Sequence, residues 1–336
     1  MRPADAVATP ALDIVDAGKV YQQWQRTGRA RDIVQNLLRP QRRTVRALSH
    51  LTLRVMPGEF VAYAGANGAG KSTTIKLLSG ILLPSEGTVR VLGLDPAKDR
   101  IALMRRIGVC FGQRTELWWD HPVITSFEWK RDVWGIPGPT YRRNLDMVTQ
   151  LLDLGDILHT FARELSLGQR MRADLGMLLL HSPEVIFLDE PTLGLDVLAK
   201  QRMIDFLRQI NRESGVTILV TSHDMDDLEA MAQRIVLLRD GEKAFDGDFA
   251  SLRRAAGAYA RVRVRAPGPA PQVEGATYLS SQDGVHEYAF DGAGSGVQAL
   301  LGSLARCPLV QDVEIGKAPI EDVIAGLYRA WREARS

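Results

Sequence analysis

The segment Gly65–Ser72, GANGAGKS, constrains the fold of this chain more than any other part of its sequence. Its glycines let the backbone curl so that successive N–H groups point inward, and a helix after it would direct its positive N-terminus to the same place. The final lysine and hydroxyl residue complete a cradle for phosphate oxygens. We therefore expect a buried strand at Phe60–Ala64, a helix at Lys71–Leu78, and an α/β fold around them.

Every position of this segment has an expected role in binding a nucleoside triphosphate with Mg²⁺. Lys71 would reach the β- and γ-phosphates, and the Ser72 hydroxyl would bind the metal ion. The predicted nucleotide-binding residues here are Gly65, Ala66, Asn67, Gly68, Ala69, Gly70, Lys71, Ser72 and Thr73.

A second apolar segment ends in two adjacent carboxylates. Residues Glu184–Leu188 read as a buried strand that leads directly into Asp189 and Glu190. Ligands of α/β sheets bind at the carboxyl ends of the strands, so both acids are expected there. Asp189 is predicted to hold Mg²⁺ through water, and Glu190 to orient and deprotonate an attacking water molecule.

The alternation of strand-like and helix-like segments after Glu59 indicates a largely parallel sheet. Val216–Val220 is a further buried strand. Ile235–Arg239 and Lys243–Phe245 form a predicted hairpin around a tight Asp240-Gly241 turn. The region from Trp118 to Leu180 has mostly helical spacing of its apolar residues.

A domain boundary is expected near 252–260, and residues 256–336 are predicted to form a small α+β domain. Arg261–Arg265 alternates apolar and charged residues, as a half-buried strand does. The other expected elements are strands at Thr277–Leu279, His286–Phe290 and Val310–Ile315, and helices at Val297–Leu304 and Ile320–Arg335.

The N-terminal part contains a basic insert, residues 22–46, between predicted strands at Ala11–Val15 and Thr52–Val55. The favoured interpretation is a solvated loop with one or two helical turns at Asp32–Leu38. The alternative is contact with a partner protein or anionic lipid. The arginines concerned are Arg26, Arg29, Arg31, Arg39, Arg42, Arg43 and Arg46.

Composition excludes several classes of protein. Net charge is +2, from 42 basic and 40 acidic residues, so no nucleic-acid partner is expected. The two cysteines, Cys110 and Cys307, are too far apart for a zinc or redox motif and fit a reducing cytoplasm. The sequence has no apolar run near the length of a membrane span and no signal-peptide pattern, so a membrane role would require a partner chain.

The segment Leu165-Ser166-Leu167-Gly168-Gln169 resembles the LSxGQ signature of ATP-binding-cassette (ABC) proteins. Further motifs agree with that family, in its order, over residues 11–247. They are Tyr21 as the A-loop aromatic, with Trp24 as the alternative, Gln113 of the Q-loop, Gly194-Leu195-Asp196 of the D-loop, and the switch histidine His223 in Thr221-Ser222-His223-Asp224.

This resemblance implies a P-loop NTPase fold of the ABC type over residues 11–252, with a helical subdomain at about 114–182. The implied activity is ATP hydrolysis. The implied catalytic residues are Lys71, Gln113, Glu190 and His223, and the implied metal-binding residues are Ser72, Gln113 and Asp189. The signature, residues 165–169, would contact ATP bound to a second subunit, so that two ATP molecules join a head-to-tail dimer. Because all motifs are intact, a homodimer is favoured.

Within the family, the chain resembles exporter cassettes of the bacterial drug-resistance type that carry a small C-terminal domain. Three features suggest it: the segment Phe111–Asp120, the segment Leu165–Arg172, and the α+β tail. The implied protein is a cytoplasmic ATPase held at the inner face of the membrane by a permease. Trp118 and Trp119 are candidates for that docking site, or else core residues. The alternatives are an importer ATPase and a regulatory ABC ATPase that serves no transporter.

Overall fold

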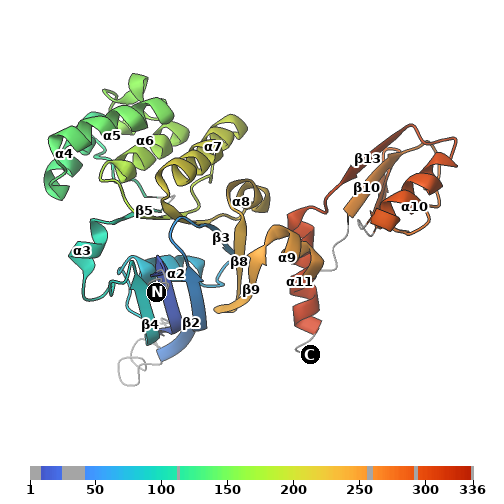
Figure 1. The fold of residues 1–336 in the computed structure, drawn as a ribbon, viewed down its shortest axis with the longest axis horizontal. Helices are drawn as coiled ribbons and strands as arrows, with labels where there is room; N and C mark the ends of the chain where they lie inside the picture. Colours follow the sequence, from blue (N-terminus) through green and yellow to red (C-terminus); the bar gives the residue numbers. More distant parts are fainter. Residues whose placement is uncertain (1–8, 25–41, 112–113, 256–259, 291–293, 334–336) are drawn as a thin grey trace, which may run out of the picture. The chain divides into compact units, whose positions relative to one another are not determined.

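A computed structural model describes residues 9–24, 42–111, 114–255, 260–290 and 294–333 (Figure 1). The predicted turns at Asp32–Leu38 and the Q-loop residue Gln113 lie outside these ranges. The chain divides into two compact units, Met1–Asp246 and Gly247–Ser336.

The first unit is built on a six-stranded sheet in the order β5-β6-β7-β3-β8-β9. The first five of these strands pair in parallel, as the sequence predicts. Their interior positions are apolar because helices cover both faces of such a sheet. The strands are β3 (Phe60–Gly65), β5 (Ile107–Phe111), β6 (Val185–Asp189), β7 (Thr217–Thr221), β8 (Arg234–Arg239) and β9 (Glu242–Asp248).

The turn between β8 and β9 is tight, as expected. Asp240 and Gly241 both have positive φ, 51° and 84°, which is the geometry that a two-residue hairpin requires.

A second, antiparallel sheet has the order β2-β1-β4, with β1 at Leu12–Trp24, β2 at Arg42–Val55 and β4 at Glu86–Val91. The pairing of β1 with β2 extends to Trp24 opposite Arg42. The prediction of a loop over the whole of 22–46 is therefore wrong at both ends. An antiparallel pair satisfies its own backbone hydrogen bonds and tolerates polar side chains on a solvated face, so the hairpin continues through basic sequence.

Helix α2 (Lys71–Leu78) contacts strands of both sheets and lies between them (Figure 1). Ile75, Leu77 and Leu78 are buried there in one apolar cluster with residues of β1 to β4. The buried Tyr63 hydroxyl donates to Thr74 Oγ1 at 3.0 Å, and Thr74 Oγ1 donates to Gly70 O at 3.2 Å. These two bonds hold the start of α2 against β3.

The region predicted to be mostly helical contains α4 (Val123–Trp134), α5 (Gly138–Leu151) and α6 (Leu167–Leu179), with 3-10 turns at Gly155–Ile157 and Ala162–Glu164. Helix α6 contacts α4, α5 and strand β5. It approaches β5 so closely that a Cβ at Gly108 would lie 2.5 Å from Leu178 Cδ2. The other helices of the unit are α3 (Arg100–Met104), α7 (Val197–Ser214) and α8 (Met225–Met231).

The second unit contains a four-stranded antiparallel sheet in the order β11-β12-β10-β13. Val262, Tyr288 and Phe290 on one face of this sheet pack against Leu300 and Leu304 of α10. The elements are α9 (Phe249–Ala255), β10 (Ala260–Arg265), β11 (Ala276–Gln282), β12 (Val285–Phe290), α10 (Gly294–Ala305), β13 (Asp312–Gly316) and α11 (Ile320–Glu333). Helix α9 contacts α11, so the units divide before α9 rather than after it.

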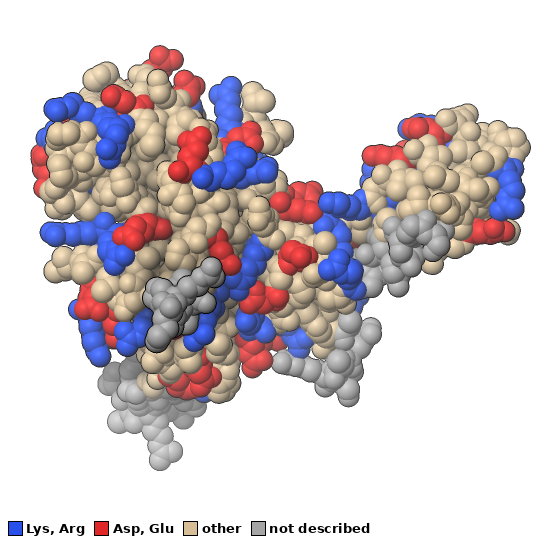
Figure 2. Space-filling view, in the orientation of Figure 1, with Lys and Arg blue, Asp and Glu red and all other residues tan. Residues whose placement is uncertain are grey.

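Basic and acidic side chains are intermingled over the face of the first unit that Figure 2 shows. Among the described residues, no helix has the length and apolar character needed to cross a bilayer.

Replacement of Tyr63 by Phe tests the link between β3 and α2. The change removes one buried hydrogen bond, and we expect the free energy of unfolding to fall by about 1 kcal/mol. Urea denaturation of the full chain, followed by tryptophan fluorescence, measures this. The exposed Tyr278→Phe is the control, and equal effects of the two changes would contradict the role given to the Tyr63 hydroxyl.

Candidate active site

The strand register brings three predicted functional segments to one edge of the six-stranded sheet. Phe111 of β5 pairs with Asp189 of β6, and Asp189 pairs with Thr221 of β7. Strand β3, which lies beside β7, ends at Gly65. The phosphate cradle, the two adjacent acids and the histidine segment therefore start side by side.

A cavity of about 630 Å³ opens at this edge. Its lining residues are Tyr21, Val45, Ala47, Asn67, Gly68, Gly70, Lys71, Ser72, Thr73, Lys76, Ile81, Phe111, Arg114, Asp189, Glu190 and Leu193. Of the predicted nucleotide-binding residues, Gly65, Ala66 and Ala69 are not in this lining. The sequence did not point to Val45, Ala47, Lys76, Ile81 or Leu193, which carry no motif and reach the cavity only through the fold.

The cradle requires glycine at its last loop position. Gly70 has φ 109°, and a Cβ there would lie 2.6 Å from Leu48 Cδ2 and 2.7 Å from Ala47 O. The close approach of β2 thus adds a steric reason to the conformational one. Gly70 also precedes the first residue of α2, so the N-terminus of that helix faces the cavity.

Lys71 is the cation of the cradle. Its Nζ donates to Gly65 O at 2.7 Å and to Ala66 O at 3.4 Å, which folds the side chain along the loop. Burial lowers the pKa of Lys71, and the negative charges of Glu190 and Asp189 act in the opposite direction. The ammonium group of Lys71 therefore interacts with two acids at the place where phosphate oxygens would bind.

Asp189 is fixed by the neighbouring strand. The Thr221 hydroxyl donates to Asp189 Oδ1 at 2.7 Å. The other carboxylate oxygen of Asp189 and the Ser72 hydroxyl oxygen can both serve as metal ligands. Hard cations such as Mg²⁺ bind oxygen ligands. The residues present therefore fit the predicted metal. Thr221 was not predicted to act here, although its place at the end of a buried strand before His223 was visible in the sequence.

Glu190 and His223 meet as a pair. Glu190 Oε2 accepts from the backbone N–H of His223 at 3.0 Å and lies 2.8 Å from His223 Nδ1. The backbone of Glu190 has φ 59°, which is uncommon for a residue with a side chain. Its N–H donates to Thr221 Oγ1 at 3.1 Å, so β7 sustains the strained conformation.

The signature lies at the start of α6. Ser166 is the N-cap, and its hydroxyl accepts from Gln169 N at 3.2 Å while Gln169 Oε1 accepts from Ser166 N at 2.9 Å. This capping box starts the helix at Leu167. None of the residues that line the cavity belongs to 165–169.

Comparisons with known proteins agree with this geometry. Residues 48–193 match the family model described as ABC transporter. The chain is 29% identical over 211 residues to the ABC transporter ATP-binding protein NatA of Bacillus subtilis, covering 63% of this chain and 85% of NatA. It is 29% identical over 296 residues to the daunorubicin/doxorubicin resistance ATP-binding protein DrrA of Streptomyces peucetius, covering 84% of this chain and 88% of DrrA.

The dimeric ATP-binding cassette MJ0796, solved in a post-hydrolysis state with ADP and Pi, shares the fold. Its TM-score is 0.59 at 23% identity, covering 70% of this chain and 98% of that one. The chain contains the ATP-binding domain of an ABC transporter. Such cassettes hydrolyse ATP to drive transport, and this domain is an ATPase of that family. The chain covers only 26% and 25% of two longer ABC transporter A family members that it also matches.

Tyr21, the predicted A-loop aromatic, lines the cavity. Its hydroxyl lies 3.5 Å from Thr73 Oγ1, and Lys19 Nζ lies 5.6 Å from the centre of its ring. Val45 is its cross-strand partner on β2, and both line the cavity. The side chain of the alternative residue, Trp24, lies outside the described part of the chain.

The D-loop of the cassette leads into α7. Asp196 is the N-cap of this helix and accepts from Ala199 N at 2.8 Å. Leu167 of the signature packs over the preceding loop, because a Cβ at Gly194 would lie 2.6 Å from Leu167 Cδ2. The signature and the D-loop are thus in contact within one chain.

A buried carboxylate that the sequence did not single out joins the signature helix to the segment after the Q-loop. Asp174 Oδ1 accepts from the Thr115 hydroxyl at 2.8 Å and from Glu116 N at 3.1 Å. Burial raises the pKa of Asp174 to about 6, although the bonds from Thr115 and Glu116 favour the charged form. Glu116 in turn pairs with the buried Lys130 of α4 at 3.3 Å.

The two tryptophans after the Q-loop are on the surface. Trp118 is 38% exposed and Trp119 is 48% exposed, so the alternative of two core residues is wrong. The guanidinium of Arg170 on α6 lies 4.6 Å from the centre of a Trp119 ring, a cation–π distance.

Replacement of Lys71 by Ala is expected to weaken ATP binding by about 10-fold to 100-fold, because a charge-assisted contact of about 1.5–3 kcal/mol is lost. Titration with ATP by calorimetry measures the dissociation constant. Lys98→Ala, at an exposed lysine outside the cavity, is the matched control. Equal affinities of the two variants for ATP would contradict the predicted role of Lys71 in binding ATP.

The raised pKa of the buried Asp174 carboxyl predicts that the stability of the chain depends on pH. Because its pKa is higher in the folded chain, the stability it contributes is fully present below about pH 4 and is lost as pH rises through 6. The free energy of unfolding of the wild type should therefore fall relative to Asp174→Asn, by at most ~3 kcal/mol, between pH 4 and pH 7. Urea denaturation across this range measures it. Asp205→Asn, at an exposed site, is the control, and a constant difference between wild type and Asp174→Asn would contradict the assignment.

Proposed function

We propose that this chain is the ATP-hydrolysing subunit of an ABC exporter, and that two copies close head to tail around two ATP molecules. One observation carries the proposal: Lys71, Asp189 and Glu190 line one cavity, with His223 bound to Glu190, while the signature of the same chain does not line it. One chain thus supplies one half of each of two sites.

Glu190 is the proposed general base. His223 binds Glu190 Oε2 through two groups, the backbone N–H and Nδ1, and Glu190 lines the cavity. Oε1 would accept a proton from water as the water oxygen attacks the γ-phosphorus, and the bond to the β-phosphate oxygen breaks to give ADP and phosphate. Gln113 is proposed to orient the same water.

Lys71 and the N–H groups of the cradle would neutralise charge on the phosphates. Ser72 and Asp189, with Gln113, are proposed to hold Mg²⁺, which when bound supplies positive charge to the phosphate oxygens. Tyr21 is proposed to stack on the adenine ring at the other end of the cavity.

The second copy would complete each site with its signature. The Ser166 hydroxyl is an acceptor within its own capping box, so its O–H remains a donor for a phosphate oxygen. A Cβ at Gly168 would make only ordinary contacts within the chain, the nearest at 3.7 Å. Packing of the chain itself therefore does not require glycine there, whereas close approach of a second chain with its ATP would. Leu165, Leu167, Gln169 and the D-loop residue Asp196 are proposed to frame this contact.

Export through a separate permease is supported by the similarity to DrrA. That similarity covers 84% of the chain, more than the first unit contains, and so extends into the second. Trp118 and Trp119, exposed after the Q-loop, are proposed to receive the permease. The subunit would then be cytoplasmic and held at the inner face of the membrane.

The variant Glu190→Gln tests the proposed function. Without the general base, we expect turnover to fall at least ~100-fold, because general-base catalysis contributes about 10²–10⁴-fold. ATP binding should persist, so Mg-ATP should convert the monomer into a dimer that lasts through size-exclusion chromatography with light scattering.

Two controls accompany it. Lys71→Ala should stay monomeric with ATP, and Glu213→Gln, at an exposed acid near the end of α7, should hydrolyse ATP as the wild type does. Retained turnover in Glu190→Gln would contradict the base assignment, and a monomer with bound ATP would contradict the homodimer.

A further inference from the structure

Lys200 forms an ionic bridge between two helices that each begin at a catalytic loop. It lies in the first turn of α7, where its N–H donates to the carbonyl of Asp196 at 2.9 Å. Its ammonium group lies 2.7 Å from Asp224 Oδ2 and 3.1 Å from Asp227 Oδ2 of α8. Lys200 is not among the residues that line the cavity.

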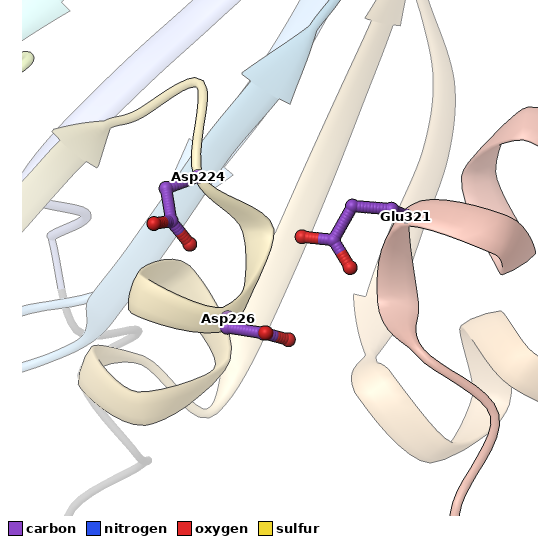
Figure 3. Close-up of side chains that lie close together, drawn as sticks. All are labelled: Asp224, Asp226 and Glu321. Atoms are coloured by element: carbon purple, nitrogen blue, oxygen red, sulfur yellow. The ribbon is translucent and has the colours of Figure 1, made fainter. Parts of the chain in front are cut away.

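Asp224 shapes the loop that presents the switch histidine. It directly follows His223 and lies at the start of α8 (Figure 3). It is the N-cap of that helix, and its Oδ1 accepts from Asp227 N at 3.1 Å. Its own N–H donates to Ser222 Oγ at 3.1 Å. Both neighbours of His223 are thereby fixed, and with them the N–H and Nδ1 that hold Glu190.

The two acids need the cation. Asp227 is 5% exposed, and a buried carboxylate without a partner is costly. Among the described residues, Lys200 is the cation within salt-bridge distance of Asp224 and of Asp227. Burial opposes ionisation of Asp224, but the bonds from Lys200 and the helix N–H groups outweigh it and lower its pKa. The same bonds raise the pKa of Lys200.

We propose that Lys200 is a positioning residue for hydrolysis: by joining the helix that starts at Asp196 to the loop of His223, it sets the position of His223 against Glu190. This inference rests on the proposed roles of Glu190 and His223. The inference goes beyond the proposed function, because it names Lys200 as the residue that connects the D-loop to His223 and, through His223, to the proposed general base Glu190. Lys200 lies one helical turn after Asp196, so a displacement of the start of α7 by a second copy reaches His223 through a single side chain.

The test compares Lys200→Met with Lys200→Arg in the full chain. Met retains the length and apolar stem but loses the charge, and we expect kcat to fall by ~10-fold while KM for ATP stays within ~2-fold. Arg retains the charge and should restore kcat to within ~3-fold of the wild type. Lys98→Met is the matched control at an exposed lysine. Unchanged kcat in Lys200→Met would overturn the proposal.

A double-mutant cycle separates positioning from general stabilisation. If Lys200 acts through His223, then adding Lys200→Met to His223→Ala should lower kcat no further, whereas independent effects would multiply. Multiplication would overturn the proposal. Should Lys200→Met fail to fold, the double variant Lys200→Met/Asp227→Asn removes the unpaired buried charge. Its kcat should still be low, and wild-type kcat in it would equally overturn the inference.

Glu190→Gln, assayed in parallel, separates this inference from the proposed function. If Glu190→Gln is inactive and Lys200→Met is fully active, the inference fails and the proposed function stands. If Glu190→Gln keeps its turnover, the general-base assignment fails, and the inference fails with it.

Discussion

The parallel pairing of β3, β7 and β6 is the constraint on which the rest of the structure depends. These three strands end at one edge of the sheet, and each leads into a segment that carries chemistry: the phosphate cradle, His223, and the pair Asp189 and Glu190. Thr221 links them, because its hydroxyl donates to Asp189 and it accepts from the backbone N–H of Glu190. Apolar burial of the strands thus fixes polar groups that are far apart in the sequence.

In the first unit, the predicted phosphate-binding residues and the signature lie in different places. The cavity is lined by Lys71, Asp189 and Glu190, which contacts His223, but no signature residue lines it. Within the same chain, the signature and the D-loop touch through Leu167 and Gly194. These two segments are thus in contact, and under the proposal above Lys200 would connect Asp196 to His223.

Much of the site was predictable because its motifs are local. The glycine-rich loop, the acids after an apolar strand and the LSxGQ segment each depend on a few adjacent residues whose backbone roles follow from their chemistry. The long β1–β2 hairpin was not predictable in the same way, since polar sequence on a solvated face looks like a loop. Asp174 and Lys200 were missed because a buried acid and a salt bridge between helices are defined by their partners rather than by spacing.

The sequence by itself determined the fold class and the cradle at Gly65–Ser72, because short-range backbone preferences and apolar periodicity encode them. The order of the other motifs followed from the resemblance to the ABC family. Only the tertiary structure decided which strands are neighbours, and hence that Thr221 supports both Asp189 and Glu190. It also decided that Trp118 and Trp119 are exposed and that Asp174 is buried. These properties arise from contacts between distant segments, and no single stretch of the chain contains them.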